Sequence, residues 1–184
     1  MQQLASKIEL LLDETHADWQ QRYVTLFNFQ QLEQLMQQAM VINGDPIVKF
    51  SVSLSWADED FSAQLNHQYR KKNKPTNVLS FPMLTLQPID DQSEWSMLTI
   101  PDFNLTDSSL FDLSPPLGDI VVCLAVVEKE AQQQNKSFQD HLSHLLIHGM
   151  LHLQGYDHSN DTDAEIMEAL EVNLLSQLGI NNPY

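Results

Sequence analysis

The sequence predicts a single α+β domain in which helices cover a small mixed β-sheet of about four strands. Two observations lead to this class. Several short apolar segments alternate with a period of two, and several longer ones repeat with the 3.6-residue period of a helix. With 184 residues, of which 42% are hydrophobic, the chain can form one core of ordinary size. Residues 1–184 are therefore predicted to form one domain, with a long surface excursion at about 83–116.

Four segments have the composition of β-strands. Residues 7–12 form the first, although their apolar run also fits a helix, and residues 47–55 alternate as in a half-buried strand. Residues 77–82 form a short strand. Residues 117–126 are almost continuously apolar, which is typical of a central strand buried on both faces.

Four further segments have helical periodicity. They are residues 29–40, 58–70, 138–153 and 163–178. In the second of them, Phe61, Leu65 and Tyr69 fall on one face. Ser137 is a suitable N-cap before the third helix, and Gly179 is a suitable C′ residue after the fourth.

Over most of their length, residues 83–116 show neither the two-residue period of a strand nor the 3.6-residue period of a helix. Acidic residues and prolines are frequent there, and proline interrupts regular structure. Loops of this length are usually functional or mobile. We predict a surface excursion, and a hairpin is one form that its chain can take.

The chain is strongly acidic, with a formal net charge of −16 at pH 7. Such a chain repels nucleic acid over most of its surface, whereas it suits docking on basic proteins. No apolar run reaches 18 residues, and residues 1–13 lack the basic region and cleavage site of a secretory signal. The single cysteine, Cys123, cannot form an internal disulfide. These features predict a cytoplasmic protein without a membrane partner.

One segment of this acidic chain is basic. Of the nine Lys and Arg residues, four lie between Arg70 and Lys74. A solvated loop is the ordinary explanation for a run of charge. Here the run precedes Pro75 and a predicted strand, which favours a localised anion site at a strand edge.

Three histidines give the strongest functional signal. His148 and His152 are one helical turn apart in the predicted helix 138–153, so their imidazoles share one face. Gly155 allows a turn, after which His158 can return to the same point. Three converging imidazoles with an open coordination position make a transition-metal site, most often for zinc. We predict one zinc ion per chain, at about 2.0–2.1 Å from each imidazole.

The histidine spacing matches the H-E-x-x-H-x-x-G-x-x-H pattern of zinc peptidases, so the helix is zincin-like. Gly149 stands where that pattern has the glutamate that takes a proton from the attacking water. The chain thus has the metal scaffold without the peptidase base, which argues against a peptidase. Glycine inside a helix costs about 1 kcal/mol relative to Ala, and we expect Gly149 to let a substrate backbone approach the metal.

A closed structural zinc site is the alternative for these histidines. Such a site usually has four protein ligands, often thiolates, and Asp157 is the best fourth ligand nearby. His141 and His144 extend the same helix face, and we expect supporting or solvent-exposed roles for them. No residue stands out as a general base; Asp157 and His144 are candidates that no motif supports.

Two other segments accompany the histidine motif. LNHQYR at residues 65–70 leads into PTNVLSFP at 75–82, LGDIVVC follows at 117–123, and HGMLHLQGYDH at 148–158 completes the set. In this order they resemble the YbeY family, bacterial rRNA maturation factors and endoribonucleases. The last segment matches the family pattern H-G-x-L-H-L-x-G-Y-D-H at every fixed position. The resemblance covers about residues 47–180.

The resemblance implies a zinc-dependent, single-strand-specific endoribonuclease of ribosomal RNA maturation, with roles in 16S rRNA 3′-end processing and ribosome quality control. It implies zinc ligands at His148, His152 and His158 and a required arginine at Arg70, so we expect Arg70 and His148 to be the catalytic residues. Many members have Asp where this chain has Asn77, so a base at that position is not available here. The implied partners are single-stranded RNA, chiefly ribosomal, and the small ribosomal subunit or its proteins.

Two function classes stay open from the sequence. The first is the endoribonuclease. The second is a non-catalytic ribosome-assembly factor with a structural or vestigial zinc site, which the missing base and the acidic charge favour. The sequence also leaves open whether water or the RNA 2′-hydroxyl attacks, where the RNA is cut, which metal is bound in the cell, and the oligomeric state.

Overall fold

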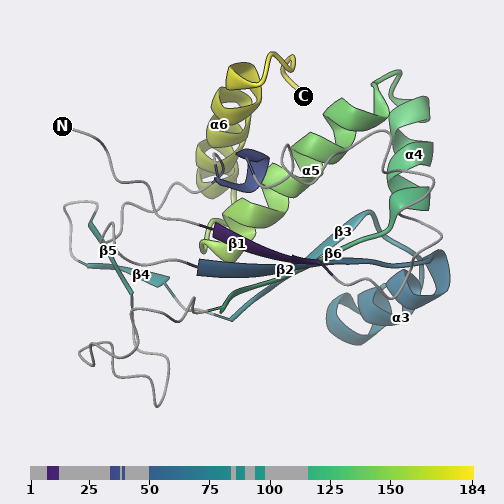
Figure 1. The fold of residues 1–184 in the computed structure, drawn as a ribbon, viewed down its shortest axis with the longest axis horizontal. Helices are drawn as coiled ribbons and strands as arrows, with labels where there is room; N and C mark the ends of the chain where they lie inside the picture. Colours follow the sequence, from purple (N-terminus) through teal and green to yellow (C-terminus); the bar gives the residue numbers. More distant parts are fainter. Residues whose placement is uncertain are drawn as a thin grey trace.

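The structure is a computed structural model that describes residues 8–12, 34–37, 39, 50–83, 86–89, 94–97 and 116–184. Its main sheet has four strands in the order β1-β2-β6-β3 (Figure 1). They are β1 (Ile8–Leu12), β2 (Phe50–Trp56), β6 (Pro116–Val122) and β3 (Val78–Pro82). The strands β1, β2 and β6 run parallel, and β3 pairs antiparallel with β6. The predicted class, α+β with a small mixed sheet, is confirmed.

Helices lie on both sides of this sheet. They are α3 (Glu59–Arg70), α4 (Leu124–Gln133), α5 (Phe138–Leu153) and α6 (Asp161–Gln177). Figure 1 shows α5 and α6 on one side and α3 on the other. Three helices begin as the sequence predicts or within two residues of it, because Asp58, Ser137 and Asn160 accept backbone N–H bonds as N-caps. Gly179 follows α6 at a φ of +73°.

The prediction of one strand over residues 117–126 is wrong at its end. The strand β6 stops at Val122, and α4, which the sequence did not predict, begins at Leu124. The apolar run continues across the boundary, so it has no period to distinguish strand from helix. The buried residues Leu124, Val127 and Ala131 show the helical spacing that the run conceals.

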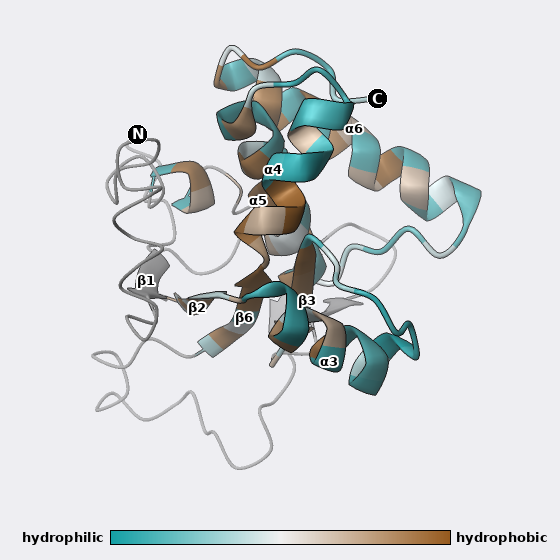
Figure 2. Cartoon of the chain, turned by 90° about the vertical axis from the view of Figure 1, so that its right-hand side faces the viewer, coloured by the Kyte–Doolittle hydropathy of each residue, from teal (hydrophilic) through white to brown (hydrophobic). Residues whose placement is uncertain are grey.

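The core lies between α5 and the sheet. Figure 2 shows hydrophobic residues gathered on α5 and the strands beside it. A Cβ on Gly149 would lie 3.0 Å from Ser80 Oγ and 3.3 Å from Ile120 Cδ1. Gly149 is buried against β3 and β6, so the expectation that it gives substrate access to the metal is wrong. The missing side chain instead lets α5 approach the sheet closely.

The helix α3 also differs from expectation. The face with Phe61, Leu65 and Tyr69 is largely exposed, and the buried residues of the helix are Ser62 and Asn66. These two polar side chains bind the segment that follows the helix. The buried face of α3 therefore positions a loop, whereas the exposed face packs Tyr69 against Phe81 at a centroid distance of 4.9 Å.

Two other predictions fall partly on the described residues. Of the predicted helix 29–40, residues 34–37 are helical, and buried Leu35, Met36 and Ala39 join the core. Buried Gln154 links this segment to the end of α5 by donating to the Ala39 carbonyl at 2.7 Å. The rest of that helix, and residues 47–49 of the second strand, lie outside the described residues.

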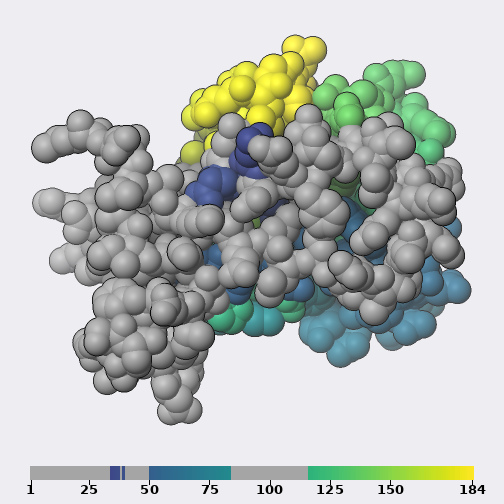
Figure 3. All heavy atoms as spheres, in the orientation of Figure 1, coloured from purple at the N-terminus to yellow at the C-terminus, as the bar shows by residue number. Residues whose placement is uncertain are grey.

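The excursion contains an antiparallel pair of strands, β4 (Leu86–Ile89) and β5 (Glu94–Met97). A hairpin is therefore confirmed as part of it. The other residues of 83–116 beyond Met83 and Pro116 lie outside the described part, so its extent, like the single domain over 1–184, stays a prediction. In Figure 3, α6 lies along the upper edge of the molecule and α3 along the lower edge.

Candidate metal centre

His148, His152 and His158 converge on one point, and we call them the histidine triad. One ring nitrogen of each lies within 4.8 Å of the others. The ring centroids of His148 and His152 are 4.5 Å apart, and that of His158 is 5.4 Å and 5.1 Å from them. The helical i, i+4 spacing produces the first pair, as the sequence predicts.

The third histidine reaches the triad through the turn that ends α5. Gly155 has a φ of +89°, a conformation that suits glycine, and its N–H bonds to the His152 carbonyl at 3.0 Å. The Tyr156 N–H reaches back to the Leu151 carbonyl at 3.1 Å. The chain therefore reverses at this glycine and returns His158 to the helix face.

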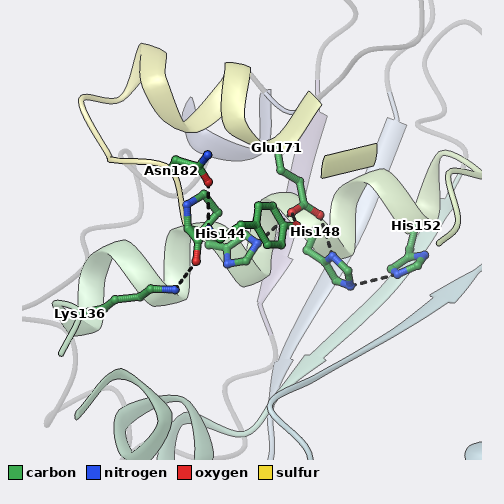
Figure 4. A network of polar contacts seen from close by, with 8 residues as sticks. Lys136, His144, His148, His152, Glu171 and Asn182 are labelled. Atoms are coloured by element: carbon green, nitrogen blue, oxygen red, sulfur yellow. Dashed lines mark hydrogen bonds and ion pairs between the residues drawn. The ribbon is translucent and has the colours of Figure 1, made fainter. Parts of the chain in front are cut away.

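Partners outside the triad fix the orientation of two rings, and Figure 4 shows the one that binds His148. His148 Nδ1 lies 2.7 Å from Glu171 Oε1, and His152 Nδ1 lies 2.9 Å from the Tyr156 carbonyl. Both partners are acceptors, so each Nδ1 carries the proton and each Nε2 has a free lone pair. The two Nε2 atoms face each other at 3.1 Å. Two lone pairs at this distance repel unless a proton or a metal ion lies between them, and with His158 they make a cluster that could hold a metal ion.

The electrostatic environment also keeps the ligands ready for a metal. Burial lowers the pKa of His152 to about 4, and neighbouring His148 adds to the effect. Burial raises the pKa of Glu171, but hydrogen bonds from His144, His148 and Tyr184 outweigh it and hold the pKa at about 2. A carboxylate behind a ligand, as Glu171 lies behind His148, is an arrangement that orients histidine ligands in metal sites, and the lowered pKa keeps His152 neutral at pH 7.

The triad lines one wall of an open cavity of about 480 Å³, which we call the metal cavity. Arg70, at the end of α3, lines the same cavity, together with residues of β3. The structure thus brings together the two predicted catalytic residues, Arg70 and His148, from different elements. The contact of Arg70 with a phosphate stays a prediction.

The other candidates lie outside the triad. His144 Nε2 is bound to Glu171 Oε2 at 2.9 Å, and His141 Nε2 is bound to Glu130 Oε2 at 3.0 Å. Asp157 lines the metal cavity, and its carboxylate accepts the His158 N–H at 2.8 Å, which lowers its pKa. Among the described residues, the metal-binding cluster consists of the three histidines alone.

The Asn77 side chain forms hydrogen bonds within the fold. Its Nδ2 donates to Glu130 Oε2 at 2.9 Å, and its Oδ1 accepts the Val78 N–H at 2.6 Å. Both ends of the amide are therefore used, and a carboxylate in its place would face Glu130. This position connects α4 to β3.

The sequence reasoning missed two residues that touch the site. Glu171 is fully buried and binds His144 and His148, and the Tyr184 hydroxyl donates to the same carboxylate. Both come from beyond the histidine motif, on α6 and in the segment after it. A buried acidic residue in an otherwise acidic helix has no local signal that distinguishes it from its exposed neighbours.

An α+β domain that presents three imidazoles and an arginine in one open cavity has the features of a metal-dependent enzyme. A family model described as Endoribonuclease YbeY matches residues 15–179. The chain is 41% identical to the Endoribonuclease YbeY of Colwellia psychrerythraea over 143 residues, which is 78% of this chain and 77% of the relative. It is 43% identical to that of Francisella tularensis subsp. tularensis over 145 residues, 79% of this chain and 75% of the relative.

The chain belongs to the endoribonuclease YbeY family. The resemblance stated from the three motifs is thereby confirmed, and so is the enzyme class, an endoribonuclease. The chain is also similar to the solution structure of TM1509 from Thermotoga maritima, at 24% identity and a TM-score of 0.48, over 93% of this chain and 88% of the other. No helix in the described ranges has both the length and the hydropathy to cross a membrane.

Proposed function

We propose that this protein is a zinc-dependent endoribonuclease that cleaves single-stranded RNA in the metal cavity. The observation that carries the proposal is the meeting of the histidine triad and the Arg70 guanidinium in one open cavity. Membership in a family whose relatives are named endoribonucleases supports RNA as the substrate.

In this proposal, different residues of the cavity bind the metal and the phosphate. The triad holds the ion, and Glu171 and the Tyr156 carbonyl keep two of its rings aimed at one point. When bound, zinc supplies a Lewis acid for a phosphoryl oxygen and lowers the pKa of water. Arg70 presents a planar, permanently charged fork that binds two phosphate oxygens and stabilises the charge that develops there.

The size of the cavity supports a preference for single strands. A cavity of about 480 Å³ accepts a group as large as one nucleotide. A base-paired strand cannot place a nucleotide there without unpairing it, which costs a few kcal/mol. An unpaired strand avoids this cost.

We place the activity in the cytoplasm, in the maturation of ribosomal RNA, including the 16S 3′ end, and in ribosome quality control. The supporting features are family membership and the net charge of −16. An acidic surface is attracted to basic ribosomal proteins, so the small ribosomal subunit is the proposed docking partner. Docking would bring the RNA to the metal cavity despite the repulsion between two anions.

Cleavage of a labelled single-stranded RNA by nuclease-free protein tests the proposal. We expect the wild-type protein with one zinc per chain to cut this RNA and to leave the same sequence in a duplex intact. His148→Ala should lose both zinc and cleavage, because it removes one of three ligands. Exchange of a histidine that is exposed on α3 and does not line the metal cavity, His67→Ala, should change neither.

Two results would favour the non-catalytic assembly factor. One is zinc-loaded protein that binds the small subunit but leaves every single-stranded RNA uncut. The other is cleavage that persists at the wild-type rate in His148→Ala, which would assign it to a contaminating nuclease.

A further inference from the structure

A second cavity adjoins the metal cavity, and we call it the lysine cavity. It measures about 400 Å³ and shares Arg70, Val78 and His148 with the metal cavity. Lys72, Lys74 and Tyr184 are among the residues that line it but do not line the metal cavity. A chain bound across the triad can therefore continue directly into this second space.

The lysine cavity concentrates positive charge in an acidic protein. Arg70, Lys72 and Lys74 line it, although the whole chain has only nine Lys and Arg residues. Within the described ranges, no carboxylate forms an ion pair with any of these three side chains. Lys74 attracts Glu130 electrostatically without forming an ion pair, so the charges of Arg70 and Lys72, and part of that of Lys74, are available to an anionic ligand. The neighbouring Lys71 differs, because its Nζ donates to the Gln68 carbonyl at 3.0 Å and it does not line the cavity.

The segment that carries the lysines is held in place by the buried side chains of α3. Asn66 Nδ2 donates to the Lys74 carbonyl at 2.7 Å. Ser62 Oγ donates to the Thr76 carbonyl at 2.8 Å and accepts the Thr76 N–H at 3.0 Å. These bonds explain why α3 buries polar residues, and they fix the backbone from which the lysines project.

Tyr184 supplies an aromatic wall. Its ring meets the His144 ring edge to face at a centroid distance of 5.6 Å, and its hydroxyl donates to Glu171. The segment around it is held by Lys136 Nζ, which donates to the Pro183 carbonyl at 2.6 Å (Figure 4). Tyr184 is nevertheless 62% exposed. A fixed, exposed ring beside unpaired cations can stack a base while the cations hold the backbone.

We propose that the lysine cavity is a nucleotide subsite, which binds the RNA nucleotide next to the one at the histidine triad. Lys72 and Lys74 bind its phosphate, and the Tyr184 ring stacks on its base. The proposal rests on the proposed function, since it names the site that holds the same RNA beside the point of cleavage. A free anion would use the lysines alone, whereas a nucleotide also uses the ring.

Binding of a non-cleavable RNA to metal-free protein tests the subsite. The probe is a fluorescein-labelled, single-stranded 2′-O-methyl RNA pentanucleotide, and its affinity is read by anisotropy at two salt concentrations. We expect the double variant Lys72→Ala/Lys74→Ala to bind about tenfold more weakly with a shallower salt dependence, because two phosphate contacts are lost. Lys71→Ala should weaken binding less than the exchange of Lys72 or Lys74 alone.

The ring is tested separately from its hydroxyl. Tyr184→Ala should weaken binding about 5- to 100-fold, the loss expected for one stacked base. Tyr184→Phe keeps the ring and should retain most of the affinity. Lys129→Ala, an exposed charge on α4 that lines neither cavity, is the control. Thermal unfolding of every variant shows whether it is folded.

Each outcome decides the proposal. If Lys72→Ala/Lys74→Ala binds like Lys129→Ala, or if Tyr184→Ala binds like wild type, the subsite is overturned. If inorganic phosphate inhibits RNA binding only when Lys72 and Lys74 are present, and Tyr184→Ala does not change RNA binding, the cavity is an anion site instead. Because the assay needs neither metal nor cleavage, a protein that binds the probe as expected but cuts no RNA would overturn the proposed function alone.

Discussion

At the scale of single residues, the histidine triad depends on what binds the far side of its rings. Glu171 has 1% of its side chain exposed, and its oxygens lie 2.7 Å from His148 Nδ1 and 2.9 Å from His144 Nε2. Such a carboxylate fixes the tautomer of a ligand and strengthens it as a donor. Glu171 is therefore a positioning residue for the metal centre.

Glu171→Gln should weaken zinc binding by about 10- to 100-fold, because a neutral amide cannot accept from both histidines while its own NH₂ stays paired. The measurement is competition for zinc with a chromophoric chelator. Glu165→Gln, exposed on the same helix, is the control and should bind zinc as wild type does. An unchanged zinc affinity in Glu171→Gln would show that the carboxylate is dispensable for the site.

Arg70→Ala should reduce RNA cleavage by roughly ten- to a hundred-fold and leave the zinc content unchanged, because a charge-assisted phosphate contact is worth about 1.5–3 kcal/mol. Arg70→Lys should restore only part of the rate, since an ammonium cannot form two parallel bonds. Cleavage rates at moderate salt, with zinc measured on the same samples, test this. Full activity of Arg70→Ala would mean that the arginine has no role at the phosphate.

At the scale of elements, the sequence correctly predicted the features that depend only on residues close together in the chain. The two histidines on α5, the cap at Ser137, and the strands β2 and β3 all follow from spacing and composition. The helix α4 does not, because its apolar start continues the run of β6. The roles of Glu171 and Tyr184 depend on where α6 packs against α5. The residues next to them in the sequence carry no pattern that predicts this contact.

Gly149 shows how packing overrides helix propensity. Alanine is the better helix former by about 1 kcal/mol, but its Cβ would press on Ser80 and on the fully buried Ile120. Overpacking typically costs about 1–3 kcal/mol. Gly149→Ala should therefore destabilise the protein by up to about 2 kcal/mol in chemical denaturation.

Adding Ser80→Ala to Gly149→Ala should recover part of the lost stability, since it removes the atom at 3.0 Å. This double variant distinguishes a local clash from a general effect on α5. A Gly149→Ala protein more stable than wild type would show that the sheet yields and that propensity dominates.

At the scale of the whole molecule, the positions of the charged side chains matter more for ligand binding than the net charge. The net charge is −16, yet the cations of the segment 70–74 that line a cavity form no ion pair with a carboxylate in the described part of the chain. The buried Glu171, in contrast, is bound by His144 and His148. Repulsion over most of the surface and attraction at one place favour a ligand that enters by a single route.

Glu130 connects three elements of the fold, and its ionisation should be visible in global stability. On α4, it accepts from His141 Nε2 of α5 at 3.0 Å and from Asn77 Nδ2, before β3, at 2.9 Å, with Lys74 adding attraction. The hydrogen bond from His141 is the largest cause that lowers the pKa of Glu130 below 4.5, against the opposing effect of burial. The ionised carboxylate therefore stabilises the folded state above pH 4.5, and this contribution is lost as the pH falls through the lowered folded pKa.

Glu130→Gln should accordingly be less stable than wild type at pH 7, by about 1–2 kcal/mol, because hydrogen bonds to a charged group are replaced by neutral ones. The difference should shrink steadily as the pH falls below 4.5, since wild-type Glu130 then becomes neutral as well. Urea denaturation of both proteins at a series of pH values measures it. Glu165→Gln, exposed on α6, should differ little from wild type at any pH. A stability difference between Glu130→Gln and wild type that is constant from pH 7 into the acid range would mean that the packing of the side chain, and not its charge, ties α4 to α5 and β3.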